Sequence, residues 1–153
     1  MKLPLNSLDN DTQLLEIGAH CGMNYVIGSE VIVYNEDGTI MPRDESNGYI
    51  NSDDRDMSRI RIVCFDFVPY ESFTAGKCYI SYIDRFSQLK EMIRLVESIN
   101  FSVVDTRMCH SFDDIIEYFT EVREKGEEGL VLKNFKGIWK SGTSKDQVKV
   151  KVI

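Results

Sequence analysis

Two short stretches near the C-terminal end of the sequence carry the residues best suited to chemistry. Glu128 and Gly129 lead into the apolar run 130–132, and Lys133 closes it. Lys149 and Lys151 follow on either side of a valine. A carboxylate can hold a divalent cation, whereas two neighbouring ammonium groups repel each other unless an anion such as phosphate lies between them. The two stretches therefore suggest a pocket for a metal ion and a phosphate.

Structural explanations of the same residues remain open. In a strand, Lys149 and Lys151 share one face while Val148 and Val150 share the other, and exposed edge strands use lysines to prevent aggregation. Residues 127–134 also fit a core strand with solvated ends. From Gly129 onward six lysines accompany a single acid, Asp146, which fits a solvated basic surface as well as a phosphate site.

Composition limits the remaining function classes. A chain of 153 residues with 42% hydrophobic residues suits one domain. Its net charge of −7 disfavours general nucleic-acid binding. It lacks both an apolar run near the ~18 residues of a membrane span and a signal-like start, so we expect a cytoplasmic protein without membrane contact. The four cysteines are widely spaced without a C-x-x-C pair, which favours reduced thiols over a metal site.

The N-terminal half predicts a helix, two strands and a loop. Residues 9–20 have a capped, amphipathic helical start, and the β-branched run 25–34 predicts a strand. A turn at 35–38 would begin a hairpin, and the polar stretch 42–56 predicts a long irregular loop. In the strand expected at 59–70, alternation points one set of side chains inward: Ile60, Ile62 and Cys64.

The C-terminal half predicts helices followed by strands. Apolar residues at spacings of three and four predict a helix over 84–99, and a strand is expected at 101–108. Ser111 with Asp114 resembles a capping box at the start of a second helix, which would end at Gly126. Inward-facing residues of the two helices are expected to be Phe86, Leu89, Ile93 and Val96, then Ile115, Ile116, Phe119 and Val122. With strands at 128–134 and 147–153, the predicted fold class is α+β.

These motifs resemble those of ATP-dependent DNA ligases. Residues 128–133 match the fourth motif, E-G-[ILV]-[ILMV]-[ILV]-K, and residues 149–151 match the fifth, K-x-K. FDFVPY (65–70) is similar to the motif whose aromatic ring stacks on adenine. Residues 27–51 are similar to the third motif with the hairpin and S-N-G segment of phage-type ligases, and 137–151 also follow the phage-type pattern. The resemblance covers roughly residues 24–153, with five motifs in order.

The resemblance implies a mechanism. Such enzymes transfer AMP from ATP to a lysine, pass it to the 5′-phosphate at a nick in double-stranded DNA, and let the 3′-hydroxyl displace AMP, as in DNA repair and replication. In-line transfer at phosphorus depends on positioning and charge neutralisation, with Mg²⁺ as the expected metal. By carry-over Glu128 would hold the metal. The nucleotide would be bound by a set of five residues: Glu30, Phe65, Lys133, Lys149 and Lys151.

Departures from the pattern imply an incomplete enzyme. The sequence contains no K-x-D-G motif, which carries the nucleophilic lysine in this family. The next ligase element, an S-R-x-G-like segment, is absent too. Gly28-Ser29 replaces the usual Asp-Gly before Glu30, and Thr143 stands where phage-type ligases have arginine. We therefore expect residues 1–153 to be a partial adenylation (nucleotidyltransferase) domain, without the oligonucleotide-binding domain and inactive alone, whose partner is a missing N-terminal segment.

Two alternatives belong to other classes. One is a non-catalytic remnant that binds a nucleotide or a ligase partner. The other is a relative of RNA ligases or capping enzymes, which share the fourth and fifth motifs. The S-N-G-x-x-N segment (46–51) and G-I-W (137–139) favour DNA ligases.

Overall fold

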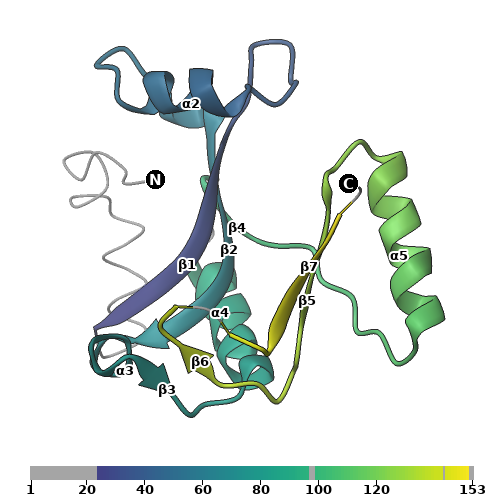
Figure 1. Ribbon diagram of the computed structural model, residues 1–153. Helices are drawn as coiled ribbons and strands as arrows, with labels where there is room; N and C mark the ends of the chain where they lie inside the picture. Colours follow the sequence, from purple (N-terminus) through teal and green to yellow (C-terminus); the bar gives the residue numbers. More distant parts are fainter. Residues whose placement is uncertain (1–23, 97–98, 143, 152–153) are drawn as a thin grey trace.

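The computed structural model describes residues 24–96, 99–142 and 144–151 (Figure 1). The helix expected at 9–20 and the substitution at Thr143 lie outside these residues. The mixture of small, mainly antiparallel sheets and helices confirms the α+β class. The elements are, in order, β1 (Tyr25–Val33), α2 (Arg43–Ile50), the short 3-10 helix η2 (Met57–Arg59), β2 (Ile60–Pro69), α3 (Tyr70–Ala75), β3 (Lys77–Cys78), α4 (Tyr82–Val96), β4 (Phe101–Val103), α5 (Phe112–Glu124), β5 (Gly129–Lys133), β6 (Trp139–Lys140) and β7 (Gln147–Lys151).

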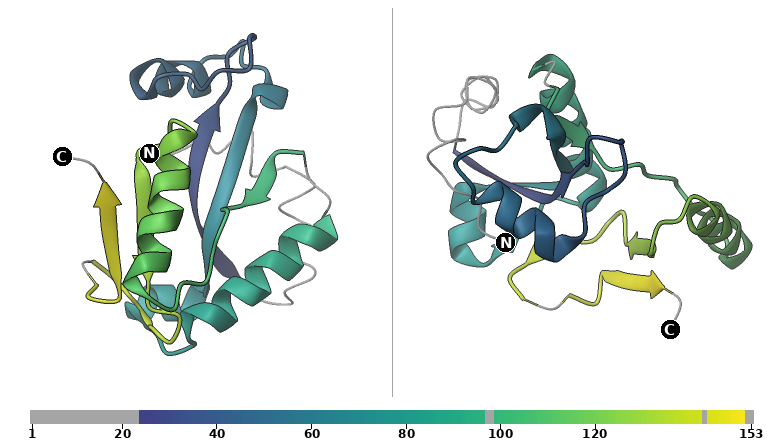
Figure 2. Two further views of the ribbon diagram at one scale, coloured as in Figure 1. Left: turned by 90° about the vertical axis from the view of Figure 1, so that its right-hand side faces the viewer. Right: turned by 90° about the horizontal axis from the view of Figure 1, so that it is seen from above.

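The first sheet holds the main core. Strand β2 lies between β1, to which it is antiparallel, and β4, to which it is parallel. Helix α4 packs across one face of this sheet (Figures 1 and 2). Leu89 is fully buried, and it packs in one cluster with several of the predicted inward side chains of β2 and α4. The core cluster consists of Ile62, Cys64, Phe67, Phe86, Leu89, Ile93 and Phe101.

A β-bulge interrupts the pairing of β1 with β2 in this sheet. Gly28 pairs with Asp66, but Ser29 pairs with Cys64, so Phe65 has no partner on β1. A bulge of this kind disrupts the alternation of side chains and re-aims them. As a result Phe65 and Asp66, although adjacent in sequence, both line the cavity described below.

A second, smaller sheet consists of β5 and β7 in antiparallel pairing. Val131 pairs with Lys149, and Gly129 pairs with Lys151. Helix α5 packs beside β5 on the side away from β1 and β2 (Figure 1). Among the described residues of α5, β5 and β7, only Val122 belongs to the buried core. This part of the molecule therefore has little core of its own.

Several expectations for local structure are confirmed. The hydroxyl of Ser111 accepts a hydrogen bond from the backbone N–H of Asp114 at 3.1 Å, so Ser111 caps α5. Gly126 follows the helix with φ 84°, a conformation that glycine adopts without a steric penalty. Ile116 is an exception on this helix, because 45% of its surface remains exposed.

Other expectations are wrong. The stretch 42–56 contains helix α2, because Ile50 is buried against Val33 and Ile60 and this tertiary contact outweighs the polar composition. The strand expected at 101–108 ends at Val103, where its pairing with β2 also ends. The short elements α3, β3 and β6 were not predicted. No helix among the described residues is both long and apolar enough to span a membrane.

Candidate nucleotide-binding site

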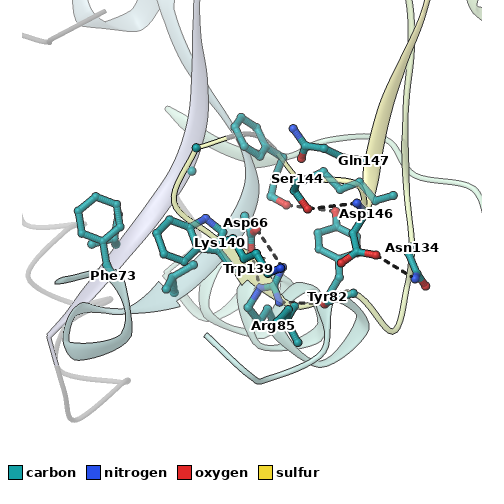
Figure 3. A pocket seen from close by; sticks show the side chains of 18 residues that line it. Asp66, Phe73, Tyr82, Arg85, Asn134, Trp139, Lys140, Ser144, Asp146 and Gln147 are labelled. Carbon is teal, nitrogen blue, oxygen red and sulfur yellow. Dashed lines mark hydrogen bonds and ion pairs between the residues drawn. The ribbon is translucent and has the colours of Figure 1, made fainter. Parts of the chain in front are cut away.

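A cavity of about 240 Å³ lies between the first sheet and the chain segment that connects β5 to β7 (Figure 3). One wall comes from β1, β2, α3 and α4, and the other comes from residues 133–147. The lining residues are Val26, Gly28, Phe65, Asp66, Val68, Phe73, Tyr82, Arg85, Lys133, Asn134, Gly137, Ile138, Trp139, Lys140, Gly142, Ser144, Asp146 and Gln147. The mixture of aromatic rings, one buried ion pair and several polar groups suits an organic ligand with a charged part.

Phe65 is placed in the cavity by the bulge and by the absence of a side chain at Gly28. A Cβ atom built on Gly28 would lie 2.9 Å from Cε2 and 3.4 Å from Cδ2 of the Phe65 ring. Glycine at this position therefore leaves room for the ring. The backbone carbonyl of Phe65 accepts a hydrogen bond from the Tyr82 hydroxyl at 3.1 Å. Phe65 keeps 37% of its surface exposed.

Lys133 brings a positive charge to the same place. Its ammonium nitrogen lies 4.8 Å from the centroid of the Phe65 ring and 4.5 Å from that of the Tyr82 ring. No ion pair to Lys133 occurs in the described part of the chain. Burial lowers the pKa of Lys133, Asp66 opposes this effect, and Arg85 adds to it. A half-buried ammonium group without an ion-pair partner suits an anionic ligand.

Asp66 and Arg85 form the buried floor beside these residues. The guanidinium group donates to both carboxylate oxygens of Asp66, at 2.9 and 3.2 Å, and the two side chains are 10% and 4% exposed. Arg85 also donates to the backbone carbonyl of Gly137 at 3.2 Å. The buried, bidentate pair joins β2 to α4, and the bond to Gly137 joins α4 to the segment after β5 (Figure 3).

The N-terminus of α4 holds the same segment. The backbone N–H of Tyr82 donates to the carbonyl of Gly137 at 2.8 Å, and that of Ile83 donates to the carbonyl of Phe135 at 2.9 Å. The first N–H groups of a helix have no partner within the helix, so this segment satisfies two of them. The contact fixes the position of Lys133, which precedes the segment directly.

Each wall also contributes an aromatic ring, and these two rings pack against each other. Trp139 lies 5.4 Å from Phe73, measured between ring centroids, at an interplanar angle of 32°. Its strand β6 pairs with β3, with Cys78 opposite Trp139 and Lys77 opposite Lys140. Trp139 is the single tryptophan of the chain, so its fluorescence can report directly on occupancy of the cavity.

The structure brings together two of the six residues that the sequence suggested. Phe65 and Lys133 line the cavity, whereas Glu30, Glu128, Lys149 and Lys151 are not among the lining residues. Lys149 and Lys151 lie on the face of the β5–β7 pair that also carries Lys133. Their partners on β5, Val131 and Gly129, precede Lys133 by two and four residues, and residues at even spacing in a strand share a face. Glu30 follows Gly28 by two residues on β1 and is exposed.

Glu128 lies directly before β5 and is exposed. Its backbone carbonyl accepts a hydrogen bond from Arg123 at 3.3 Å. The following Gly129 approaches β7 so closely that a Cβ atom built on it would collide with the carbonyl oxygen of Val150. Only glycine fits there, which explains the Glu-Gly pair at the start of the strand. The described residues contain no cluster of three or more carboxylate, histidine or cysteine side chains suited to a metal ion.

The lining residues that sequence reasoning missed include Asp66, Tyr82, Arg85 and Trp139. Asp66 and Trp139 belong to stretches that resemble ligase motifs, but no role followed from the pattern. Tyr82 and Arg85 lie in the first turn of α4. The helix expected at 84–99 begins after Tyr82, and its predicted inward-facing set does not include Arg85. A buried arginine has no signal in a single sequence, because its burial depends on the carboxylate that pairs with it.

Comparison with known proteins identifies relatives of this chain. Residues 9–151 match the family model described as the ATP dependent DNA ligase domain. The DNA ligase of Enterobacteria phage T4 is 24% identical over 118 residues, which cover 72% of this chain and 24% of that protein. The chain thus spans about a quarter of the curated relative it matches.

Solved structures share the fold. A chain named Pmar-Lig_PreS3 is similar with a TM-score of 0.72 and 15% identity over 92% of this chain and 33% of that one. The ATP-dependent DNA ligase of bacteriophage T7, in complex with ATP, has a TM-score of 0.68 and 14% identity over 95% of this chain and 48% of that one. Because the family model covers nearly all of the sequence, the chain belongs to the family of ATP dependent DNA ligase domains.

Proposed function

We propose that this chain binds ATP or AMP in the cavity and serves as the nucleotide-binding part of the adenylation domain of a DNA ligase. The observation that carries the proposal is the meeting of the Phe65 ring and the Lys133 ammonium in one cavity. A purine can stack on an aromatic ring, and an ammonium group without an ion-pair partner can bind a phosphate. Because the chain belongs to the family of ATP dependent DNA ligase domains, an adenine nucleotide is the ligand that we propose.

The other candidate residues have defined roles in the proposal. Lys149 and Lys151, on the face of Lys133, bind the phosphates, and Glu30 binds the ribose side. Glu128 supplies a carboxylate for Mg²⁺. Mg²⁺ on a nucleotide takes most of its ligands from phosphate oxygens and water, so one or two carboxylates suffice, which is compatible with the absence of a three-ligand cluster among the described residues. The metal, when bound, neutralises phosphate charge.

In the proposal this chain positions the nucleotide and does not attack it. The family nucleophile is the lysine of K-x-D-G, and the 153 residues contain no such motif. Lys133 lies over two rings, and in the proposal it pairs with a phosphate of the nucleotide. A polypeptide with the K-x-D-G lysine would complete the adenylation domain, and nicked double-stranded DNA would be the substrate of the complete enzyme.

Fluorescence of Trp139 tests nucleotide binding. We expect ATP and AMP to change the emission with saturation, and Phe65→Ala to weaken binding about 5- to 150-fold, as the loss of base stacking of ~1–3 kcal/mol implies. Gly28→Ala should also weaken binding, because its Cβ displaces the Phe65 ring. Gly48→Ala is the matched control, since nothing lies within 4 Å of its Cβ. Equal affinity in all four proteins would refute the site.

Intact-mass spectrometry tests the division of labour. Incubated with ATP and Mg²⁺, this chain alone should gain no AMP-sized mass. Addition of a ligase segment with the K-x-D-G lysine should produce the adduct on that segment, and Glu128→Ala or Lys149→Ala should abolish it, since both act on the transition-state charge. An adduct on this chain alone contradicts the proposal.

A further inference from the structure

The Lys133 ammonium lies over the Phe65 ring, on which a purine would stack. Its nitrogen lies over two aromatic rings, 4.8 Å from the Phe65 centroid and 4.5 Å from the Tyr82 centroid. Cations bind the faces of aromatic rings within about 6 Å of the centroid. The described part of the chain therefore contains a two-ring cation site, and Lys133 of the same chain occupies it.

A stacked purine and this ammonium compete for one place. Stacked atoms lie about 3.5–4.0 Å from the ring that they cover, within the distance at which the ammonium lies. Gly28 closes the Cδ2–Cε2 edge of the Phe65 ring so tightly that it excludes even a methyl group. Both Phe65 and Lys133 line the cavity, so a ligand in the cavity meets the ring face that Lys133 covers. A purine that stacks on this face must displace the ammonium.

We propose that Lys133 determines specificity by making the cavity discriminate against nucleosides that lack a phosphate. This inference rests on the proposed function. Displacement of the ammonium from two rings costs its cation–π contacts. A nucleotide offers the displaced group a phosphate oxygen, which forms a charge-assisted hydrogen bond. An uncharged nucleoside offers nothing in return. Base stacking and phosphate binding are coupled because one side chain takes part in both.

Tyr82 is the positioning residue of this arrangement. Its ring forms the second side of the cation site, while its hydroxyl donates to the Phe65 carbonyl at 3.1 Å. It also stacks on Phe86 of the core, with ring centroids 5.6 Å apart. Loss of the ring would weaken the hold on Lys133, whereas loss of the hydroxyl alone would leave the cation contact in place.

Adenosine and AMP are the probes that separate the two roles of Lys133. In Lys133→Met, calorimetry or NMR titration should show adenosine binding about three- to tenfold tighter, because the competing cation is gone. AMP should bind about tenfold weaker or worse, because a hydrogen bond to a charged group is lost. The opposite signs are the signature of the mechanism. A structural defect weakens both ligands, and a simple phosphate contact leaves adenosine unchanged, and either result overturns the inference.

Lys136→Met is the matched control. Its ammonium also lies over a ring, 5.6 Å from the Phe135 centroid, but Lys136 does not line the cavity. Both affinities should equal those of the wild type, and a change of the same pattern would count against a role specific to Lys133. Tyr82→Leu, like Lys133→Met, should tighten adenosine binding. Tyr82→Phe, which keeps the ring, should change adenosine binding little.

The ε-methylene NMR signal of Lys133, identified by its loss in Lys133→Met, gives an independent readout. It should show an upfield ring-current shift in the free protein and lose it when AMP binds. A signal that stays in place with AMP bound overturns the displacement while leaving the proposed function intact. If neither AMP nor ATP binds the wild-type protein, the proposed function and the inference both fail.

Discussion

The two sheets of this molecule differ in how they are stabilised. The β1–β2–β4 sheet packs on α4 around a cluster that includes Cys64 and Leu89, each with no exposed surface. The β5–β7 pair has α5 on one side, and all described residues of the two strands are half-buried or exposed. The first region can therefore hold Phe65 rigidly, whereas the second has little apolar burial of its own.

This difference assigns distinct tasks to the two regions. The stable sheet supplies the ring and the buried Asp66–Arg85 pair, and the weaker pair of strands supplies lysines. The weaker region is held by the N-terminus of α4, by Arg85 and by the β3–β6 pairing. A ligand between the regions would add contacts to both, so its binding should stabilise the β5–β7 side most.

Leucine truncations provide the strongest test of the comparison. Leu89→Ala should cost about 2–5 kcal/mol of the free energy of unfolding, because it leaves a cavity in the main core. Leu132→Ala, on half-buried β5, should cost only about 1 kcal/mol. Urea denaturation measures both. Equal costs would show that the two regions share one cooperative core.

Gly129→Ala should damage the weaker region alone. The added Cβ collides with the carbonyl of Val150, and an overpacked contact costs about 1–3 kcal/mol. Because β7 is held mainly by β5, we expect faster amide hydrogen exchange in β5 and β7, with α4 and β2 unchanged. Gly48→Ala, with open space around its Cβ, should leave exchange in β5 and β7 as it is. Faster exchange throughout the molecule would contradict the separation.

The pH dependence of stability should show the smallest effect. Burial lowers the pKa of Lys133 below its unfolded value, so between these two values the folded state binds fewer protons than the unfolded state. The contribution of Lys133 therefore destabilises the fold at neutral pH, and this penalty is relieved as the pH rises through the folded pKa towards about 10.4. Lys133→Met should be more stable than the wild type at neutral pH, with an advantage that shrinks in alkali. Thermal melts of both proteins across this pH range measure the difference in stability. A difference that does not change with pH would contradict the penalty assigned to the ammonium.

Local patterns in the sequence predicted much of the fold. Alternation of Ile60, Ile62 and Cys64 defined the core face of β2, and apolar spacing defined α4 through Phe86, Leu89 and Ile93. These predictions succeeded because burial on one face imposes a period of two or 3.6 residues. Helix α2 was missed because its stability depends on the burial of Ile50 against residues distant in sequence, which no local pattern contains.

For the site, the sequence by itself determined which residue types are available: an aromatic ring at Phe65, a lysine at the end of β5, and the Glu-Gly pair before it. It also determined the family, since motif order survives where overall identity is low. Only the tertiary structure decided that Phe65 and Lys133 meet in one cavity while Glu128 lies outside its lining. The bulge that aims Phe65 and Asp66 into the same space depends on the pairing register with β1. The burial of Arg85 depends on Asp66 and on the carbonyl of Gly137. Such contacts join residues that are far apart in the chain, so their geometry arises only when the strands and helices pack together.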